Sequence, residues 1–79
     1  MTNEEKLKNI FLTSLGITEK EFNNDLKYHS IPQWDSISHM SLVSAIDDAF
    51  GTMMDVDDVT SLNTFSKAKE ILIKYGIQF

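Results

Sequence analysis

The sequence of 79 residues contains no cysteine, one proline and three glycines. Without cysteine the chain forms no disulfide, offers no thiolate to a metal and has no thiol nucleophile of its own. It also lacks any apolar run near the ~18 residues that a membrane-spanning helix needs. Its acidic, polar start, Met1–Glu5, is unlike a secretory signal. We therefore expect a cytoplasmic protein without a membrane span.

Positive charge is scarce as well, because seven lysines and no arginine face twelve acidic residues, for a net charge of −5. The segment 28–66 contains no lysine or arginine, and its six aspartates give it a charge of −6. These aspartates are Asp35, Asp47, Asp48, Asp55, Asp57 and Asp58. Such a surface repels nucleic-acid phosphates, so we expect a basic protein rather than a nucleic acid as partner.

The hydrophobic content of 42% is enough for the core of one small domain spanning residues 1–79. Thr2 and Glu5 form a capping-box pattern, and an amphipathic segment follows it and ends before Gly16. This predicts a first helix over about residues 3–15. The linker 17–34 lacks a sustained period and carries scattered apolar anchors and turn formers. The turn formers are Asn23, Asn24, Asp25, Ser30 and Pro32. A linker of this length suggests either function or an extra short helix, for which Thr18–Phe22 is the candidate.

Three further helices are predicted beyond the linker. The second runs from its N-cap Asp35 to Phe50, a short third covers about Val56–Leu62, and a fourth follows Asn63 or Thr64. No alternating β pattern of useful length is present. The predicted fold is an all-α four-helix bundle, with three longer helices and one short third helix.

The second predicted helix has an unusual start. On the helical wheel Ile37 and Met40 fall on the solvent side, beside Ser41, Asp47 and Asp48. Exposed apolar side chains among acids are typical of a docking surface for a partner protein. The alternative is that the long linker covers them.

Ser36 directly follows the predicted N-cap and lies in the first turn of this helix. Its hydroxyl is therefore expected to be accessible and close to the positive end of the helix dipole. A phosphate ester there would be favoured by roughly 0.3–1 kcal/mol. The plainer interpretation is that a serine at this position only helps to cap the helix.

Residues 35–50 resemble the second helix of acyl carrier proteins, in which Asp-Ser-hydrophobic precedes regularly spaced apolar residues, an acidic pair and Phe. The matching positions are Asp35, Ser36, Leu42, Val43, Ala45, Ile46, Asp47, Asp48 and Phe50. The short acidic third segment near Asp55–Val59 and the fourth opening at Asn63–Phe65 fit the same family. The resemblance thus covers essentially the whole chain, and it implies the acyl-carrier four-helix bundle.

The resemblance implies that Ser36 is the attachment point of 4′-phosphopantetheine, delivered from coenzyme A by a phosphopantetheinyl transferase. It implies that Asp35 helps to orient the transferase or its metal, and that the chain itself is not an enzyme and holds no metal. The arm would carry an acyl intermediate as a thioester. A monomer would present it to acyl-loading and acyl-processing enzymes of fatty-acid or specialised acyl biosynthesis. An aminoacyl or peptidyl carrier, or an unmodified helical adaptor, remains the alternative.

The chain departs from the pattern of housekeeping fatty-acid carriers at four positions. It has Ser38, Ser41 and Ala49 where they usually carry acids, and Ile37 where they carry Leu. The recognition helix is therefore less acidic, and Trp34–Ile37 with His39 resembles carriers of specialised pathways.

Two other groups of residues do not match a known type of site. Ser36, Asp35 and His39 do not make a hydrolytic triad, because adjacent helix positions do not face each other. We expect His39 to be partly buried and hydrogen-bonded, or else to line the mouth of an acyl-binding cleft. The acids Asp55, Asp57 and Asp58 lack the glycine and glutamate of a calcium loop.

Overall fold

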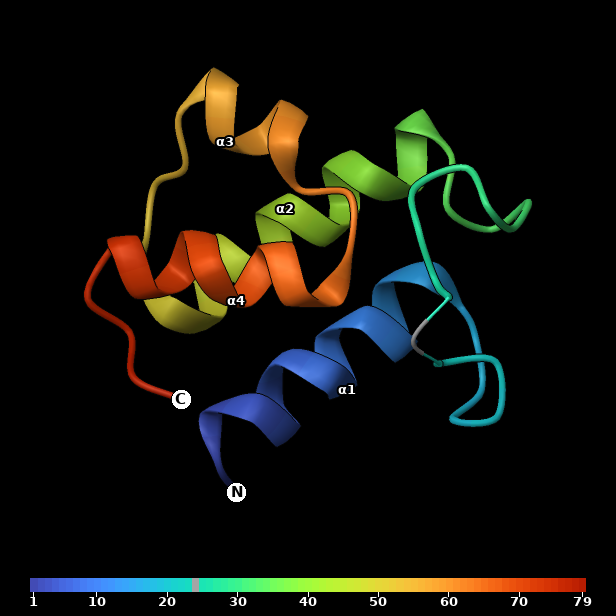
Figure 1. Ribbon diagram of the computed structural model, residues 1–79, viewed down its shortest axis with the longest axis horizontal. Helices are drawn as coiled ribbons and strands as arrows, with labels where there is room; N and C mark the ends of the chain where they lie inside the picture. Colours follow the sequence, from blue (N-terminus) through green and yellow to red (C-terminus); the bar gives the residue numbers. More distant parts are fainter. Residues whose placement is uncertain (24) are drawn as a thin grey trace.

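Local hydrogen bonds at the helix starts set the architecture of the chain. The computed structural model describes residues 1–23 and 25–79; Asn24, in the predicted turn, lies outside the described residues. Over these ranges the chain has no strand and four helices, α1 (Asn3–Leu15), α2 (Ser36–Phe50), α3 (Val56–Ser61) and α4 (Phe65–Lys74) (Figure 1). The predicted all-α bundle is confirmed. None of the helices in the described part is long and apolar enough to cross a membrane.

Each helix begins at a side chain that accepts the N–H three residues ahead. The N-caps are Thr2, Asp35, Asp55 and Thr64. This confirms the capping box and selects Thr64 over Asn63 as the fourth cap. α1 and α2 end at Gly16 and Gly51, whose φ angles of 65° and 67° lie in the left-handed region that favours glycine. The predicted boundaries therefore agree with the structure to within one or two residues.

The linker between α1 and α2 is irregular but tied to the body of the protein. Thr18 and Glu21 make a turn by reciprocal hydrogen bonds of the capping-box type, and no further helix forms in the linker's described residues. An isolated antiparallel bridge joins Lys27 to Thr64. In Figure 1 the linker passes the end of α1 and rises to the start of α2. The linker thus delivers its last residues to the N-terminal end of α2.

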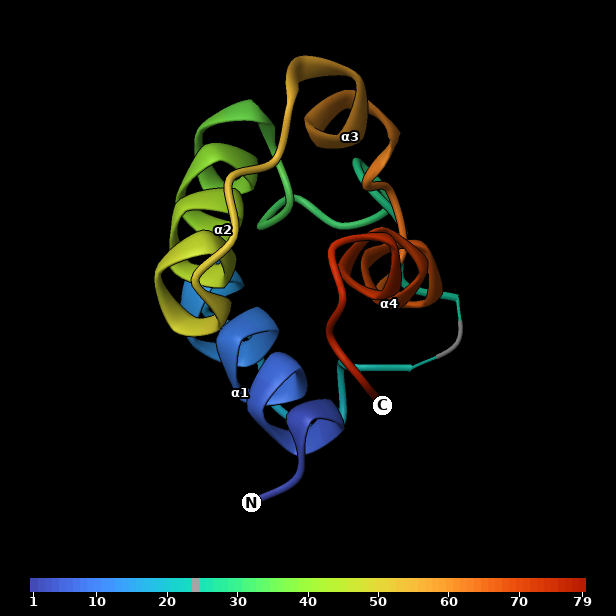
Figure 2. The same cartoon turned by 90° about the vertical axis from the view of Figure 1, so that its left-hand side faces the viewer.

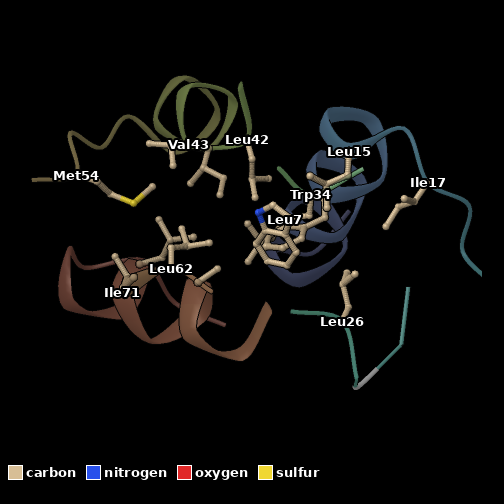
Figure 3. Close-up of a cluster of buried hydrophobic side chains, with 14 residues drawn as sticks. Leu7, Leu15, Ile17, Leu26, Trp34, Leu42, Val43, Met54, Leu62 and Ile71 are labelled. Carbon is tan, nitrogen blue, oxygen red and sulfur yellow. The ribbon is translucent and has the colours of Figure 1, made fainter. Parts of the chain in front are cut away.

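One hydrophobic core holds the four helices and the linker together. Figure 2 shows α2 and α4 on opposite sides of the molecule, with α3 beside the upper part of α2. Trp34 is fully buried, and its ring meets that of Phe11 edge-on at 5.6 Å. The buried set drawn in Figure 3 is Leu7, Phe11, Leu15, Ile17, Leu26, Trp34, Leu42, Val43, Ile46, Met54, Leu62, Ala68, Ile71 and Leu72. Linker residues among these explain why so long an irregular segment remains fixed.

Candidate functional site

The start of α2 presents a carboxylate at the N-cap and a hydroxyl at the first helical residue. The backbone N–H of Ser38 donates to Asp35 Oδ1 at 2.8 Å, and this hydrogen bond holds the pKa of the Asp35 carboxyl below its ordinary value. Ser36 is the first residue of the helix, and its side chain is exposed. The structure therefore places the predicted attachment residue at the surface, beside an ionised N-cap.

Tyr28 of the linker reaches this hydroxyl. Its phenolic oxygen lies 3.0 Å from Ser36 Oγ, and either atom can be the donor. The Tyr28 ring is half-buried, stacks on His29 with centroids 4.0 Å apart, and tilts against His39 at 5.0 Å. Tyr28 could not be singled out from the sequence, because an aromatic residue in an aperiodic linker gives no indication of which residue it will contact.

His39 connects three segments behind this pair. Trp34 Nε1 donates to His39 Nδ1 at 3.0 Å, and His39 Nε2 lies 2.8 Å from the carbonyl oxygen of Val59 in α3. An indole N–H only donates and a carbonyl only accepts, so Nδ1 is the acceptor and Nε2 carries the proton. The expectation of a partly buried, hydrogen-bonded His39 is confirmed. Both ring nitrogens are hydrogen-bonded, so neither is free to act as a base on Ser36.

A cleft of about 270 Å³ opens beside Ser36, between the linker, α2 and α3. Its lining residues are Tyr28, Ser36, His39, Met40, Val59 and Thr60. His39 is therefore hydrogen-bonded, as expected, and it also lines this cleft, whereas the binding of an acyl group there stays a prediction. The cleft combines apolar side chains with hydroxyls, and one of those hydroxyls belongs to the candidate modification site.

The predicted docking residues divide into two groups. Ile37 and Met40 are 81% and 55% exposed, so the linker does not cover them, and Ser41 and Asp48 are exposed beside them. Asp47 differs from the expectation that it lies on the solvent side. It is half-buried because the chain after Gly51 folds back over it.

The contacts of Asp47 explain this correction. Its Oδ1 accepts the hydroxyl of Thr52 at 2.7 Å and the N–H of Met54 at 3.3 Å. A side chain that closes the α2–α3 connection in this way has less capacity for a partner. The exposed predicted docking set is therefore Ile37, Met40, Ser41 and Asp48.

The acids of α3 do not form a ligand set. Asp58 is buried and accepts hydrogen bonds from Lys74 Nζ and from the Tyr75 hydroxyl at 2.6 Å. The Lys74 ammonium, together with Tyr75, lowers the pKa of Asp58 below its usual range. Nowhere in residues 1–23 and 25–79 do three His, Asp or Glu side chains gather as they would around a metal ion.

No model of a known protein family matches the chain. We therefore infer the function from the residues at the start of α2 and from the geometry around them.

Proposed function

We propose that this protein is an acyl carrier whose 4′-phosphopantetheine arm is attached to Ser36. The observation that carries the proposal is the exposed Ser36 hydroxyl in the first turn of α2, next to the ionised N-cap Asp35 and at a mixed cleft. The acyl-carrier resemblance of residues 35–50, stated from the sequence, supports the same assignment.

The residues around Ser36 fit the group chemically. An anionic ester at the first turn of a helix is stabilised by the helix dipole, by roughly 0.3–1 kcal/mol at an exposed position. The Ser36 side chain is exposed to solvent although Tyr28 of the linker contacts its hydroxyl, which suits a residue that a transferase must reach. The neighbouring Asp35 carboxylate provides a negative charge that attracts a cation brought by the transferase.

In the attachment step the Ser36 hydroxyl accepts the phosphopantetheine group. Ser36 Oγ forms a bond to the pantetheine-bearing phosphorus of coenzyme A, and the diphosphate bond breaks. Adenosine 3′,5′-bisphosphate leaves with the electron pair, and the Ser36 proton passes to a base of the transferase. The arm, once attached, supplies the thiol that this cysteine-free chain lacks, and that thiol holds an acyl group as a thioester.

The carrier itself has no catalytic role in this proposal, and we propose that it works as a monomer. Client enzymes would dock on Ile37 and Met40 with Ser41 and Asp48 around them, a small mixed surface suited to brief encounters. The less acidic recognition helix favours a client from a specialised acyl pathway over housekeeping fatty-acid synthesis.

The test is modification in vitro. The purified chain is incubated with coenzyme A and a broad-specificity phosphopantetheinyl transferase, and the mass of the intact protein and of its peptides is measured. We expect one added phosphopantetheine on the peptide that contains Ser36, and none on a Ser36→Ala variant. Ser44→Ala removes another exposed hydroxyl of α2 and is the matched control, which should be modified as the parent is.

Folding of the variants must be checked, because an unfolded chain would also fail to be modified. A surface hydroxyl in the first helical turn contributes little to packing, so Ser36→Ala should melt within about 2 °C of the parent. An unmodified parent chain would contradict the carrier function and leave the helical adaptor as the better description. Modification that persists in Ser36→Ala would contradict the site.

A further inference from the structure

The hydroxyl pair Tyr28–Ser36 has a consequence for the modification itself, and the inference rests on the proposed function. At 3.0 Å, the two oxygens share one hydrogen bond across the mouth of the cleft. Ser36 is fixed by its place in α2, whereas Tyr28 comes from the irregular linker. The position of the Tyr28 hydroxyl therefore depends on the contacts that hold Tyr28 within the linker.

Backbone and side-chain hydrogen bonds fix Tyr28. Its N–H donates to the carbonyl of Asn63 at 2.9 Å, next to the bridge between Lys27 and Thr64. The hydroxyl of Ser30 accepts the Lys27 N–H at 2.8 Å and donates to the Lys27 carbonyl at 2.6 Å. The linker is thus bound to the α3–α4 connection directly at Tyr28.

The aromatic surroundings fix the direction of the ring. His29, with a positive φ of 68°, stacks on the face of Tyr28, and the ring meets Trp34 edge-on at 6.2 Å. Trp34 is in turn bonded to His39, whose ring tilts against Tyr28. A half-buried ring packed in this way has little choice of rotamer, so its hydroxyl is delivered to one place.

The hydrogen bond must change character when Ser36 is esterified. Before modification each hydroxyl can donate to the other. Afterwards the Ser36 oxygen carries phosphorus in place of its proton and can only accept, while the Tyr28 hydroxyl still has a proton to donate. The negative charge of the ester lies on its non-bridging oxygens, and a hydrogen bond to such an anionic oxygen is stronger than one between neutral hydroxyls. The Tyr28 hydroxyl, 3.0 Å from Ser36 Oγ, therefore lies close enough to donate to the phosphate of the product.

We propose that Tyr28 is a positioning residue for the modification of Ser36. Its hydroxyl selects one of the staggered orientations of the Ser36 side chain and afterwards donates to the phosphate ester. The ring packs on the interior, so the docking residues Ile37 and Met40 keep their exposure with or without this hydroxyl. The contribution of Tyr28 therefore falls on the chemical step and leaves the encounter with the transferase unchanged.

The experiment compares Tyr28→Phe, which removes only the hydroxyl, with Tyr75→Phe. The second variant makes the same chemical change on α4's C-cap, where the hydroxyl bonds Asp58. Initial rates of transfer from coenzyme A are measured by intact mass over a range of carrier concentrations, well below the melting temperature. We expect kcat to fall roughly three- to tenfold in Tyr28→Phe, the worth of one hydrogen bond, with KM for the carrier within about twofold. Tyr75→Phe should match the parent in both constants.

A second readout reports the contact in the modified protein. The arm brings the chain its only phosphorus atom, so its 31P resonance should differ between the parent and Tyr28→Phe and agree between the parent and Tyr75→Phe. Unchanged kcat with an unchanged resonance would overturn the positioning role, and so would a rise in KM at constant kcat. A parent chain that accepts no arm at all would be recognised before any comparison, and it would overturn the proposed function together with this inference.

Discussion

The two tyrosine hydroxyls of this protein can be compared directly, because each contacts the first turns of a helix from outside that helix. Tyr28 lies 3.0 Å from the exposed Ser36 at the start of α2, in a neutral pair. Tyr75 donates at 2.6 Å to the buried carboxylate of Asp58 in α3, in a charged one. The first pair leaves hydrogen-bonding capacity at the surface, whereas the second uses its capacity within the fold.

The network around Asp58 shows how a buried carboxylate is satisfied by hydrogen bonds within the fold. Asp58 receives Lys74 and Tyr75, and the Tyr75 oxygen in turn accepts the N–H of Asp55 at 3.2 Å. The hydrogen bond from Lys74 to Asp58 also raises the pKa of Lys74. Short, charge-assisted hydrogen bonds of this kind hold the six-residue α3 against α4, because so short a helix is marginal alone. At the other pair, a neutral hydroxyl stays available for chemistry.

The largest effect should therefore appear in stability when Tyr75 is changed. We expect Tyr75→Phe to lower the melting temperature by roughly 5–10 °C, because it leaves the buried Asp58 oxygen without this donor. Tyr28→Phe should melt within about 2 °C of the parent. Thermal unfolding followed by circular dichroism measures both. Equal losses in the two variants would break the comparison.

The pH dependence of stability should single out Asp58. Its pKa is lowered in the folded chain, so its contribution is present above the unfolded value of about 3.9 and is lost as the pH falls through the folded value. Asp58→Asn should therefore be less stable than the parent at pH 7, and the difference in melting temperature should shrink below about pH 4. Asp57→Asn, an exposed neighbour in α3, is the control. If the difference in melting temperature between Asp58→Asn and the parent stays constant across this pH range, Asp58 does not supply the acid-sensitive contact.

The adjacent acids Asp47 and Asp48 offer the same contrast on a smaller scale. Asp47→Asn should lower the melting temperature by a few degrees, since Asp47 holds Thr52 and Met54. Asp48→Asn should leave the melting temperature unchanged. In the modification assay it should raise the transferase's KM for this protein about twofold at low salt, with the effect fading as salt rises. A raised KM for Asp47→Asn with an unchanged melting temperature would contradict this division between the two residues.

The features that the sequence predicts well are those that depend on neighbours along the chain. The N-caps Thr2, Asp35 and Asp55 act on an N–H three residues away, and the exposure of Ile37 and Met40 follows from helical periodicity. The position of Ser36 at the helix start is predictable for the same reason. These local rules are sufficient for the four helices and for the accessibility of the candidate site.

What could not be predicted depends on segments that meet only in the folded chain. Tyr28 reaches Ser36 through a turn built on Ser30 and a bridge to Thr64, neither of which has a periodic signature. Asp47 is half-buried because residues after α2 fold back, and Asp58 points inward only once α4 has packed. In each case a polar residue was assigned to solvent or to no role because its partner lies outside its own helix or turn, where helical periodicity gives no information.

The bond between Trp34 and His39 makes the protein a reporter of its own state. Trp34 is the sole tryptophan, and its indole is bonded to the imidazole that also holds the Val59 carbonyl of α3. A displacement of α3 from α2 would strain this chain of contacts and change the surroundings of the only strong intrinsic fluorophore. Emission from unlabelled protein can therefore report any displacement of α3 from α2 beside the cleft at Ser36.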